Sequence, residues 1–172
     1  VKLWNAKDGE PILVIPEATA NCTVEAIAFH PKEKILAAAG INWLGRRESD
    51  GVIVLWDWEA LKCIRVLEGG ASRVAFSPDG KMLATVSVLN ESVVVWDLAT
   101  GTILQELSDL DSSTNAVAFD AQGRYLASGS DDFGLRVWDT SDWSIVVAED
   151  LETSIKDVVF TPDGRALITG NG

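Results

Sequence analysis

Several residue types that carry chemistry are scarce in this chain of 172 residues. It has one histidine, one methionine and one tyrosine. Its two cysteines, Cys22 and Cys63, lie far apart and form no CxxC pair. Zinc sites and disulfide frameworks need closely spaced or numerous cysteines, so the sequence excludes both. We therefore expect no metal and no cofactor, and a cytoplasmic, reducing location.

The motifs of nucleotide binding and nucleophilic catalysis are missing as well. The sequence contains no GxxxxGK[ST] and no GxGxxG phosphate loop. The one histidine, His30, stands outside the column of hydroxyl residues described below, so no Ser-His-Asp arrangement can be assembled. The acidic pairs at 109/111 and 131/132 lack the spacing of a calcium loop, and we interpret them as exposed acids. We predict that the chain is not an enzyme.

Basic residues and long apolar runs are also few. Fourteen Lys and Arg residues face 26 Asp and Glu residues, for a net charge of −12. Nucleic-acid binding relies on basic surface, so we expect no nucleic-acid partner. No apolar run approaches the roughly 18–20 residues of a spanning helix, and no signal peptide opens the chain. The acidic excess is concentrated in residues 106–172; we interpret it as a solvated face, with a docking surface for a basic partner as the alternative.

A repeat organises the residues that are present. The composition is 47% hydrophobic, which is enough for a large core and excludes intrinsic disorder. One segment occurs four times: AFHPKEKILAAAG (28–40), AFSPDGKMLATVS (75–87), AFDAQGRYLASGS (118–130) and VFTPDGRALITGN (159–171). A second, ending in Trp, also occurs four times: VKLW (1–4), IVLW (53–56), VVVW (93–96) and LRVW (135–138). Two independent series with a period of about forty residues establish an internal repeat.

Each repeat predicts four short strands. The PDG segments at 78–80 and 162–164 are tight turns between apolar runs, which indicates a hairpin. A third strand ends at the Trp, and a turn such as 97–101 leads to a fourth at 103–107. The strand VVVW lacks polar alternation, so both of its faces should be covered by neighbouring sheets arranged radially. We predict an all-β fold in which the wedges between sheets are filled by Trp4, Trp56, Trp96 and Trp138.

The succession FxPDG[KR]xLA[ST]xS, followed by a strand ending in WD, resembles the WD-repeat (WD40) family of β-propellers. SGSDDFGLRVWD (128–139) is nearly the family consensus. The resemblance covers the whole chain. It implies four-stranded antiparallel blades, rings of seven or eight blades, and a rigid platform for contacts between proteins.

A structural network of Ser/Thr, His, Asp and Trp, frequent in that family, is only partly matched. The matching hydroxyls are Thr85, Ser128 and Thr169, with Ala38 in the first unit. The matching turn acids are Asp50 and Asp132, with Asn90 between them, and the family's His is missing from every unit. We therefore expect less rigid blades in which the network does not form as in the family, and in which Asp132 caps backbone amides of its own turn.

The strand count implies incomplete units at both ends. We expect a half blade at 1–16, three blades at about 24–67, 71–107 and 114–148, and a half blade at 155–171. Natural proteins avoid unpaired strand edges, and the first residue is Val1 rather than Met. We interpret the chain as a segment of a larger protein whose missing part supplies the remaining blades. The alternative is that a second copy pairs its half blades with this one.

Two sets of residues are candidates for partner binding. The segment INWLGRRE (41–48) enlarges one turn and places Trp43, Leu44, Arg46 and Arg47 in a loop, and Trp and Arg are enriched in interface hot spots. The alternative is a loop folded back on its own blade. A second set follows from the family resemblance alone: Glu25, Asn115 and Lys156 precede the Phe by four residues, near the channel mouth, and Asp131 precedes the turn acid.

The function that we predict from these observations is a non-catalytic scaffold for other proteins or peptides, and a basic partner is the alternative that the acidic excess leaves open. The second hypothesis is a regulatory or sensor propeller attached to an enzyme, such as a bacterial protein kinase or a signalling ATPase. The third is a propeller enzyme, which the single misplaced histidine argues against.

Overall fold

The structure is a computed structural model of residues 1–172, and it describes residues 1–14, 23–41, 51–87, 92–108 and 114–172. All regular structure in these ranges is β-strand. Blade 1 consists of β3 (Thr23–Phe29), β4 (Ile35–Ile41), β5 (Val52–Asp57) and β6 (Lys62–Glu68). Blade 2 consists of β7 (Arg73–Phe76), β8 (Met82–Ser87), β9 (Ser92–Asp97) and β10 (Ile103–Leu107). Blade 3 consists of β11 (Thr114–Phe119), β12 (Tyr125–Ser130), β13 (Gly134–Asp139) and β14 (Ile145–Asp150).

Two hairpins complete the described chain. The N-terminal hairpin pairs β1 (Lys2–Trp4) with β2 (Pro11–Val14), and the C-terminal hairpin pairs β15 (Ile155–Phe160) with β16 (Leu167–Asn171). In every sheet, consecutive strands are antiparallel neighbours. The sequence prediction of an all-β fold built from four-stranded antiparallel sheets is therefore confirmed.

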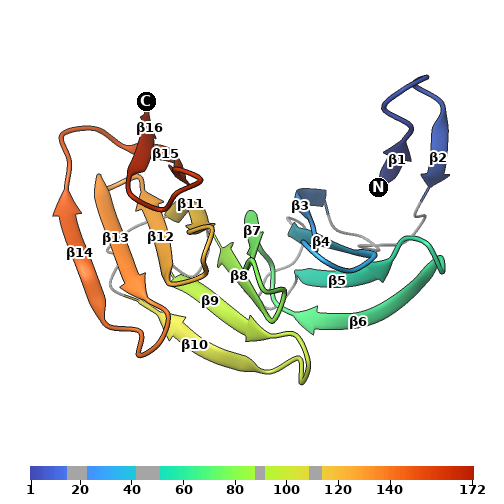
Figure 1. The fold of residues 1–172 in the computed structure, drawn as a ribbon, viewed down its shortest axis with the longest axis horizontal. Coiled ribbons are helices and arrows are strands. Elements are labelled where there is room, and N and C mark those ends of the chain that lie inside the picture. The colour runs from blue at the N-terminus through green and yellow to red at the C-terminus, as the bar shows by residue number, and fades with distance from the viewer. Residues whose placement is uncertain (15–22, 42–50, 88–91, 109–113) are drawn as a thin grey trace.

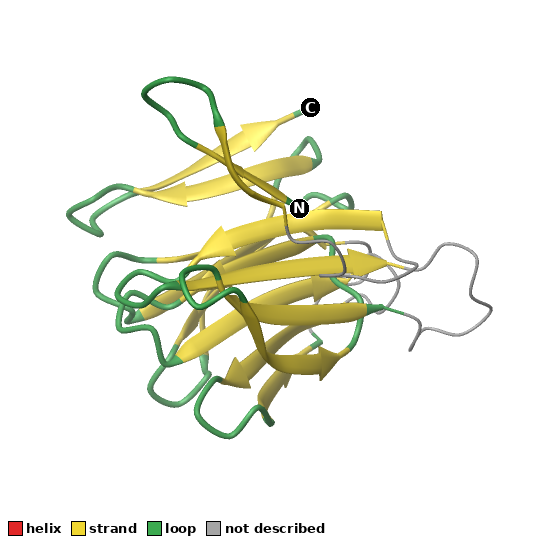
Figure 2. Ribbon diagram, turned by 90° about the vertical axis from the view of Figure 1, so that its right-hand side faces the viewer, coloured by secondary structure: helices red, strands yellow, loops and turns green. Residues whose placement is uncertain are grey.

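The sheets follow one another around an arc. The first strand of each sheet contacts the first strand of the next, from β3 to β7, β11 and β15. These strands line the inside of the arc, whereas β6, β10 and β14 form its outside (Figure 1). The view from the side shows the same sheets stacked one behind another (Figure 2). The two hairpins lie at the opposite ends of the arc.

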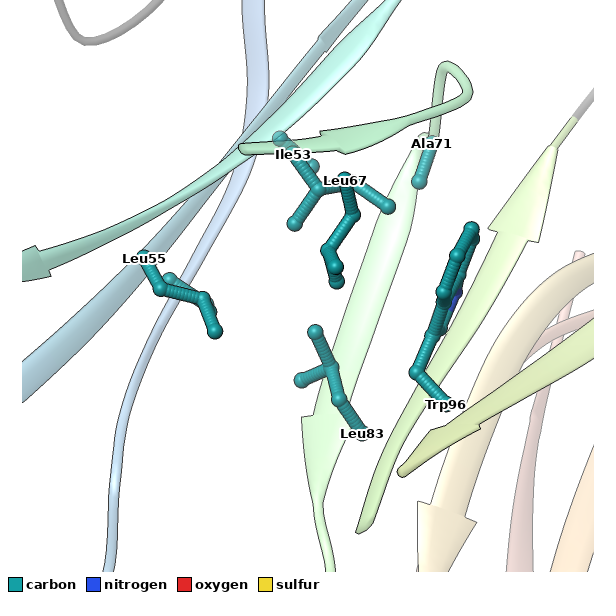
Figure 3. Packing of buried hydrophobic residues seen from close by; sticks show 8 residues of the cluster. Ile53, Leu55, Leu67, Ala71, Leu83 and Trp96 are labelled. Carbon is teal, nitrogen blue, oxygen red and sulfur yellow. The ribbon is translucent and has the colours of Figure 1, made fainter. Parts of the chain in front are cut away.

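Apolar side chains from two blades meet in each interface. Ile53, Leu55 and Leu67 of blade 1 face Leu83 and Trp96 of blade 2 (Figure 3). Ala37 and Ala39 of β4 lie in the same interface, where small side chains let the next sheet approach closely. The same arrangement recurs between blades 2 and 3, where Val93 and Val95 pack with Leu126 and Trp138.

The repeated tryptophans differ in burial because each one packs against the sheet that precedes it. Trp96 contacts blade 1 and is 7% exposed, and Trp138 contacts blade 2 and is 1% exposed. Trp56 is half-buried beside Val1 of the short N-terminal hairpin. Trp4 differs from the predicted wedge position: its side chain is 52% exposed, and no sheet among the described residues covers it as blades 1 and 2 cover Trp96 and Trp138.

Candidate functional site

Three of the predicted partner-binding residues come together where blade 3 meets the C-terminal hairpin. The Asn115 side chain donates hydrogen bonds to Asp131 Oδ1 (2.7 Å) and to the Ile155 carbonyl (3.1 Å). The Lys156 ammonium forms an ion pair with the same Asp131 oxygen. The Lys156 and Asn115 hydrogen bonds hold the pKa of Asp131 below its ordinary value, so this carboxylate stays ionised.

The backbone explains why these residues project from their strands. Asn115 lies at a β-bulge between Thr114 and Ala116, and Lys156 lies at the equivalent bulge in β15. A bulge leaves one residue without a cross-strand partner and redirects its side chain. The fourth predicted residue, Glu25, lies at the matching bulge of β3, in blade 1. Aligning the internal repeats located these equivalent positions, but it gave no sign that they are β-bulges.

The same end of blade 3 carries an exposed aromatic side chain among acids. Phe133, at the β12–β13 turn, has φ 74° and is 42% exposed, and its carbonyl accepts a hydrogen bond from the Leu151 N–H (2.9 Å). This bond joins the turn to the segment after β14. We define the acidic turn surface as residues 131–133 and 149–152, whose acids are Asp131, Asp132, Glu149, Asp150 and Glu152. Asp150 forms an ion pair with Arg136 (3.0 Å), whereas the Glu149 and Glu152 side chains are exposed and form no ion pair with a described residue.

The hydroxyl column behaves differently in each blade. In blade 2 the Trp96 indole N–H donates to Thr85 Oγ1 (3.0 Å). In blade 1, where Ala38 replaces the hydroxyl residue, the Trp56 indole nitrogen is buried without a hydrogen-bond partner. In blade 3 the Ser128 hydroxyl is buried without a partner. Among the described residues, a Thr–Trp pair of the family's kind is thus seen in blade 2.

The turn acid Asp132 mainly contacts a side chain. Its Oδ1 accepts a hydrogen bond from the Ser130 hydroxyl, and the Gly134 N–H lies 3.5 Å from the same oxygen. Ser130 Oγ is the closer partner of the Gly134 N–H (3.1 Å). The Gly134 N–H is thus shared between Asp132, which we expected to cap it, and Ser130. Thr169 is half-buried in β16, a strand without a described third-strand neighbour. Asp50 and the loop residues Trp43, Leu44, Arg46 and Arg47 lie outside the described residues.

A further repeated position, the residue directly after each Phe, was not recognised from the sequence. The residue after each Phe accepts a backbone N–H of its own hairpin turn: His30, Ser77, Asp120 and Thr161. His30 Nδ1 accepts the N–H groups of Lys32 and Glu33, so Nε2 carries the proton and donates to the Gly80 carbonyl of blade 2 (2.9 Å). The sole histidine is therefore a structural link between blades. The signal in the sequence was a polar residue at the same place in all four units.

In the part of the chain that the structure describes, two of the hollows lie between neighbouring sheets. One, of about 450 Å³, lies between blades 1 and 2, and its lining includes His30, Arg65, Asp79 and Asp97. The Arg65 guanidinium donates hydrogen bonds there to the carbonyls of Ala99 and Thr100. The other, of about 350 Å³, is mostly apolar and lies between blade 3 and the C-terminal hairpin. Among the described residues, no three His, Cys, Asp or Glu side chains are grouped so as to hold a metal ion. The same part of the chain holds no helix able to cross a membrane.

Antiparallel four-stranded sheets, set side by side around an arc with an aromatic wedge between neighbours, define a β-propeller repeat protein. The family model described as "WD domain, G-beta repeat" matches residues 9–57, 61–97 and 101–139. The chain therefore belongs to the WD40 repeat family.

Similar curated proteins are longer than this chain. Protein HIR1 of Cryptococcus neoformans var. neoformans serotype D is 31% identical over 134 residues, which cover 74% of this chain and 15% of HIR1. A chromatin assembly factor 1 subunit of Mus musculus is 22% identical over 223 aligned residues, covering 100% of this chain and 37% of that protein. Nuclear distribution protein PAC1 of Arthroderma benhamiae is 27% identical over 184 aligned residues, covering 95% of this chain and 38% of PAC1. The chain thus spans less than half the length of each of these relatives.

Proposed function

We propose that the chain is a non-catalytic interaction scaffold whose acidic turn surface binds a basic segment of a protein partner. The observation that carries the proposal is the exposed Phe133 side chain, which stands among five acidic residues at one end of blade 3. Aromatic side chains are enriched in protein interfaces, and complementary charge steers partners together. Membership of the WD40 family and the name of one relative, a chromatin assembly factor subunit, support a role in protein assembly.

The chemistry of the surface favours a partner segment that is both basic and partly apolar. An apolar side chain of the partner would cover Phe133, and Lys or Arg side chains would meet Glu149 and Glu152, which no described cation neutralises. Asp131 is held in place by Asn115 and is already paired with Lys156, so it adds little to the attraction that Glu149 and Glu152 exert. Charge pairs on an exposed surface are screened by salt, so the affinity should fall as ionic strength rises.

A fluorescent Lys/Arg-rich peptide containing one Leu tests the proposal by anisotropy titration against the full chain at about 0.15 M salt. We expect Glu149→Gln with Glu152→Gln to weaken binding about three- to thirtyfold, since each lost exposed contact is worth roughly 0.3–1 kcal/mol. The matched control is Glu10→Gln with Glu33→Gln, which removes the same charge from exposed positions elsewhere. Equal weakening by both double variants, or no binding of the peptide, would overturn the proposal.

The loop at 41–48 stays a prediction, and its test is separate. If Trp43 and Arg47 contact a partner, replacing both with Ala weakens capture of that partner while leaving binding at the acidic turn surface unchanged. The cytoplasmic location also stays a prediction. The names of two relatives refer to chromatin and to nuclear distribution, and neither supports that compartment.

A further inference from the structure

The turn that follows the repeated Trp has the same backbone conformation in four described sheets. The fifth residue after the Trp has a positive φ in each: 75° at Gly9, 55° at Leu61, 76° at Gly101 and 62° at Trp143. This conformation favours glycine, yet two of the four residues are large and apolar. Because the backbone is shared, a side chain at this position leaves each turn in the same direction. The sheets therefore differ in what this turn presents to its neighbour.

Between blades 2 and 3, this position carries an indole. Trp143 is half-buried and packs against the apolar cluster that blades 2 and 3 share. Met82, the first residue of β8 in blade 2, packs against the same cluster. The Trp143 N–H donates to the Asp139 carbonyl (2.7 Å), which keeps the turn closed and leaves its backbone outside the cluster. A side chain carried on a turn thus fills space at this interface.

Between blades 1 and 2, the same position is Gly101. A Cβ atom on Gly101 would lie 2.7 Å from Arg65 Cδ and 2.9 Å from Arg65 Cζ, so this position faces blade 1. The hollow of about 450 Å³ lies beside Arg65, and Ile35 is part of its wall. By strand register, Ile35 is equivalent to Met82. The hollow therefore corresponds to the space in which Trp143 packs at the next interface.

The walls of this hollow suit a planar apolar group. Its apolar residues are Ile35, Leu55, Ile64 and Leu98. Lys32 and Lys81 line it as well, and the Lys81 side chain is 82% exposed. Lys34, which precedes its Leu by two residues as Lys81 does, holds its ammonium 4.8 Å from the centroid of the Trp58 ring. A lysine at this repeat position thus already stacks on an indole, and such cation–π attraction favours an aromatic occupant over an aliphatic one.

We propose that the hollow between blades 1 and 2 binds a tryptophan side chain of a protein partner. The occupant belongs to a chain rather than to a free small molecule, because the equivalent space between blades 2 and 3 holds a side chain whose turn stays outside. The hollow is lined by charges of both signs, Lys32 and Lys81 with Glu33 and Asp79. Charge therefore selects no partner here, and the ring is what is recognised.

This hollow and the acidic turn surface lie at opposite ends of the blades. The hollow is lined by the turns β3–β4, β7–β8 and β9–β10, whereas residues 131–133 form the β12–β13 turn. In an antiparallel meander, the turn between the second and third strands lies at the end opposite the other two turns. The inference is therefore independent of the function proposed above. Glu149→Gln with Glu152→Gln should leave tryptophan binding unchanged.

A ligand-observed NMR titration of the full chain measures the binding. The probe is a pentapeptide with one Trp between pairs of Gly residues, acetylated and amidated so that it carries no terminal charge. We expect a dissociation constant of roughly 0.1–1 mM, the order for one inserted ring. The same peptide with Leu in place of Trp should bind about two- to fivefold more weakly, because it lacks the cation–π contact. Equal binding of the two peptides, or no binding of the Trp peptide, would overturn the proposal.

Transplanting residues between the two interfaces locates the site. Arg65→Gln with Gly101→Trp fills the hollow from within, since the equivalent residues of the next interface are Gln105 and Trp143. This double variant should bind the Trp peptide at least about tenfold more weakly, whereas Arg65→Gln alone should stay within about threefold of the unsubstituted chain. Circular dichroism checks that the blades remain folded. Unchanged binding by the folded double variant would place the peptide elsewhere.

The reciprocal change opens the equivalent space. Trp143→Gly should create a second site between blades 2 and 3, so that this variant binds two Trp peptides where the unsubstituted chain binds one. Added to the filled double variant, the same substitution should restore binding to within about threefold. Trp143→Gly also decides the matter should Gly101→Trp fail to fold, because it leaves the hollow beside Arg65 intact. A folded Trp143→Gly chain with one site would contradict the equivalence of the two spaces.

Discussion

Trp138 and Trp4 occupy the same position of the repeat but have opposite environments. Trp138 is 1% exposed in the interface between blades 2 and 3, and Trp4 is 52% exposed at the N-terminal end of the arc. Trp4 is the last residue of β1 and Trp138 the last but one of β13, and each directly follows an apolar residue. The difference lies in the neighbour, since Trp138 has a complete sheet in front of it. The burial of the repeated Trp is therefore provided by the sheet of the preceding unit. Its own unit provides the strand on which the Trp lies.

The largest effect should come from deleting the buried Trp. We expect Trp138→Ala to lower the free energy of unfolding by about 3–5 kcal/mol, the usual loss for a fully buried Trp. Trp56→Ala should cost less than half as much, because that side chain is half-buried and its indole nitrogen has no hydrogen-bond partner. Urea denaturation of the two variants measures both values. A loss below about 1 kcal/mol for Trp138→Ala would show that the wedge is not part of the core.

The second prediction concerns the interface between blade 3 and the C-terminal hairpin. A Cβ atom at Gly129 would lie 2.3 Å from Ile155 Cγ2 and 2.8 Å from Ile155 Cβ. Gly129→Ala should therefore push the hairpin from blade 3, at a cost of roughly 1–3 kcal/mol. Hydrogen exchange should accelerate in β15 and β16 and remain unchanged in blades 1 and 2.

The control for this variant is Gly170→Ala, which lies in β16 of the hairpin, whereas Gly129 lies in β12 of blade 3. There the new Cβ would meet its nearest neighbour at 3.5 Å, which is ordinary contact. We expect a change within about 0.5 kcal/mol and no acceleration of exchange. If both variants accelerated exchange equally, close packing at Gly129 would not be what fixes the hairpin.

Strand number, strand order and the family could be predicted because the repeat supplies four aligned copies of each signal. The aligned Phe, Leu and Trp positions predicted that the same strands recur in each unit, and the structure adds a pairing that also recurs, Leu83 with Trp96 and Leu126 with Trp138. The exposure of Trp4 was not predicted, because aligned residues were assumed to share an environment. That environment depends on a preceding sheet, which a local pattern does not contain.

The candidate site was predictable only in part, for a different reason. The column of Asn115 and Lys156 was located from the alignment, and Asp131 from the position of its turn. Their mutual contact depends on a bulge in each first strand and on the placement of the C-terminal hairpin beside blade 3. Phe133 was missed because a single Phe in a polar turn resembles no column of the repeat. Phe133 has a positive φ, which belongs to this turn and has no counterpart in the repeated sequence pattern, and this backbone conformation accompanies the exposure of its side chain.

The third prediction separates the hydroxyl columns of blades 2 and 3. Thr85→Val removes the acceptor of the Trp96 indole N–H and leaves that buried donor unpaired, so we expect a loss of about 1–3 kcal/mol. Ser128→Ala is the matched change in blade 3, where the buried hydroxyl has no hydrogen-bond partner. Removing it should leave stability unchanged or raise it slightly, since an unsatisfied buried hydroxyl is itself unfavourable. Chemical denaturation of the two variants gives the comparison. Equal losses would mean that the hydroxyls act through packing alone.

The smallest effect should come from the charges that join blade 3 to the C-terminal hairpin. Asp131 has its pKa lowered from an ordinary 3.8, chiefly by its hydrogen bond from Lys156 and then by that from Asn115. A carboxyl whose pKa is lower in the folded state stabilises that state above its unfolded pKa, and the contribution disappears as pH falls through the folded value. Asp131→Asn should therefore cost less than about 1 kcal/mol at pH 7, since the ion pair is exposed. The difference from the unsubstituted chain should shrink as the pH falls below 3.8 and vanish only below the folded pKa of Asp131, which is lower than 3.8.

Salt distinguishes this ion pair from carboxylates that are held only by hydrogen bonds. The pKa of Asp142 is also lowered, but by hydrogen bonds from Ser144 rather than by a cation. In about 1 M salt the effect of Asp131→Asn should shrink, because its partner Lys156 is screened, whereas the effect of Asp142→Asn should persist. Urea denaturation at low and high salt, each at pH 7 and pH 3, measures the four differences. An Asp131→Asn effect insensitive to salt would show that the Asn115 amide, and not the Lys156 charge, holds the turn against the hairpin.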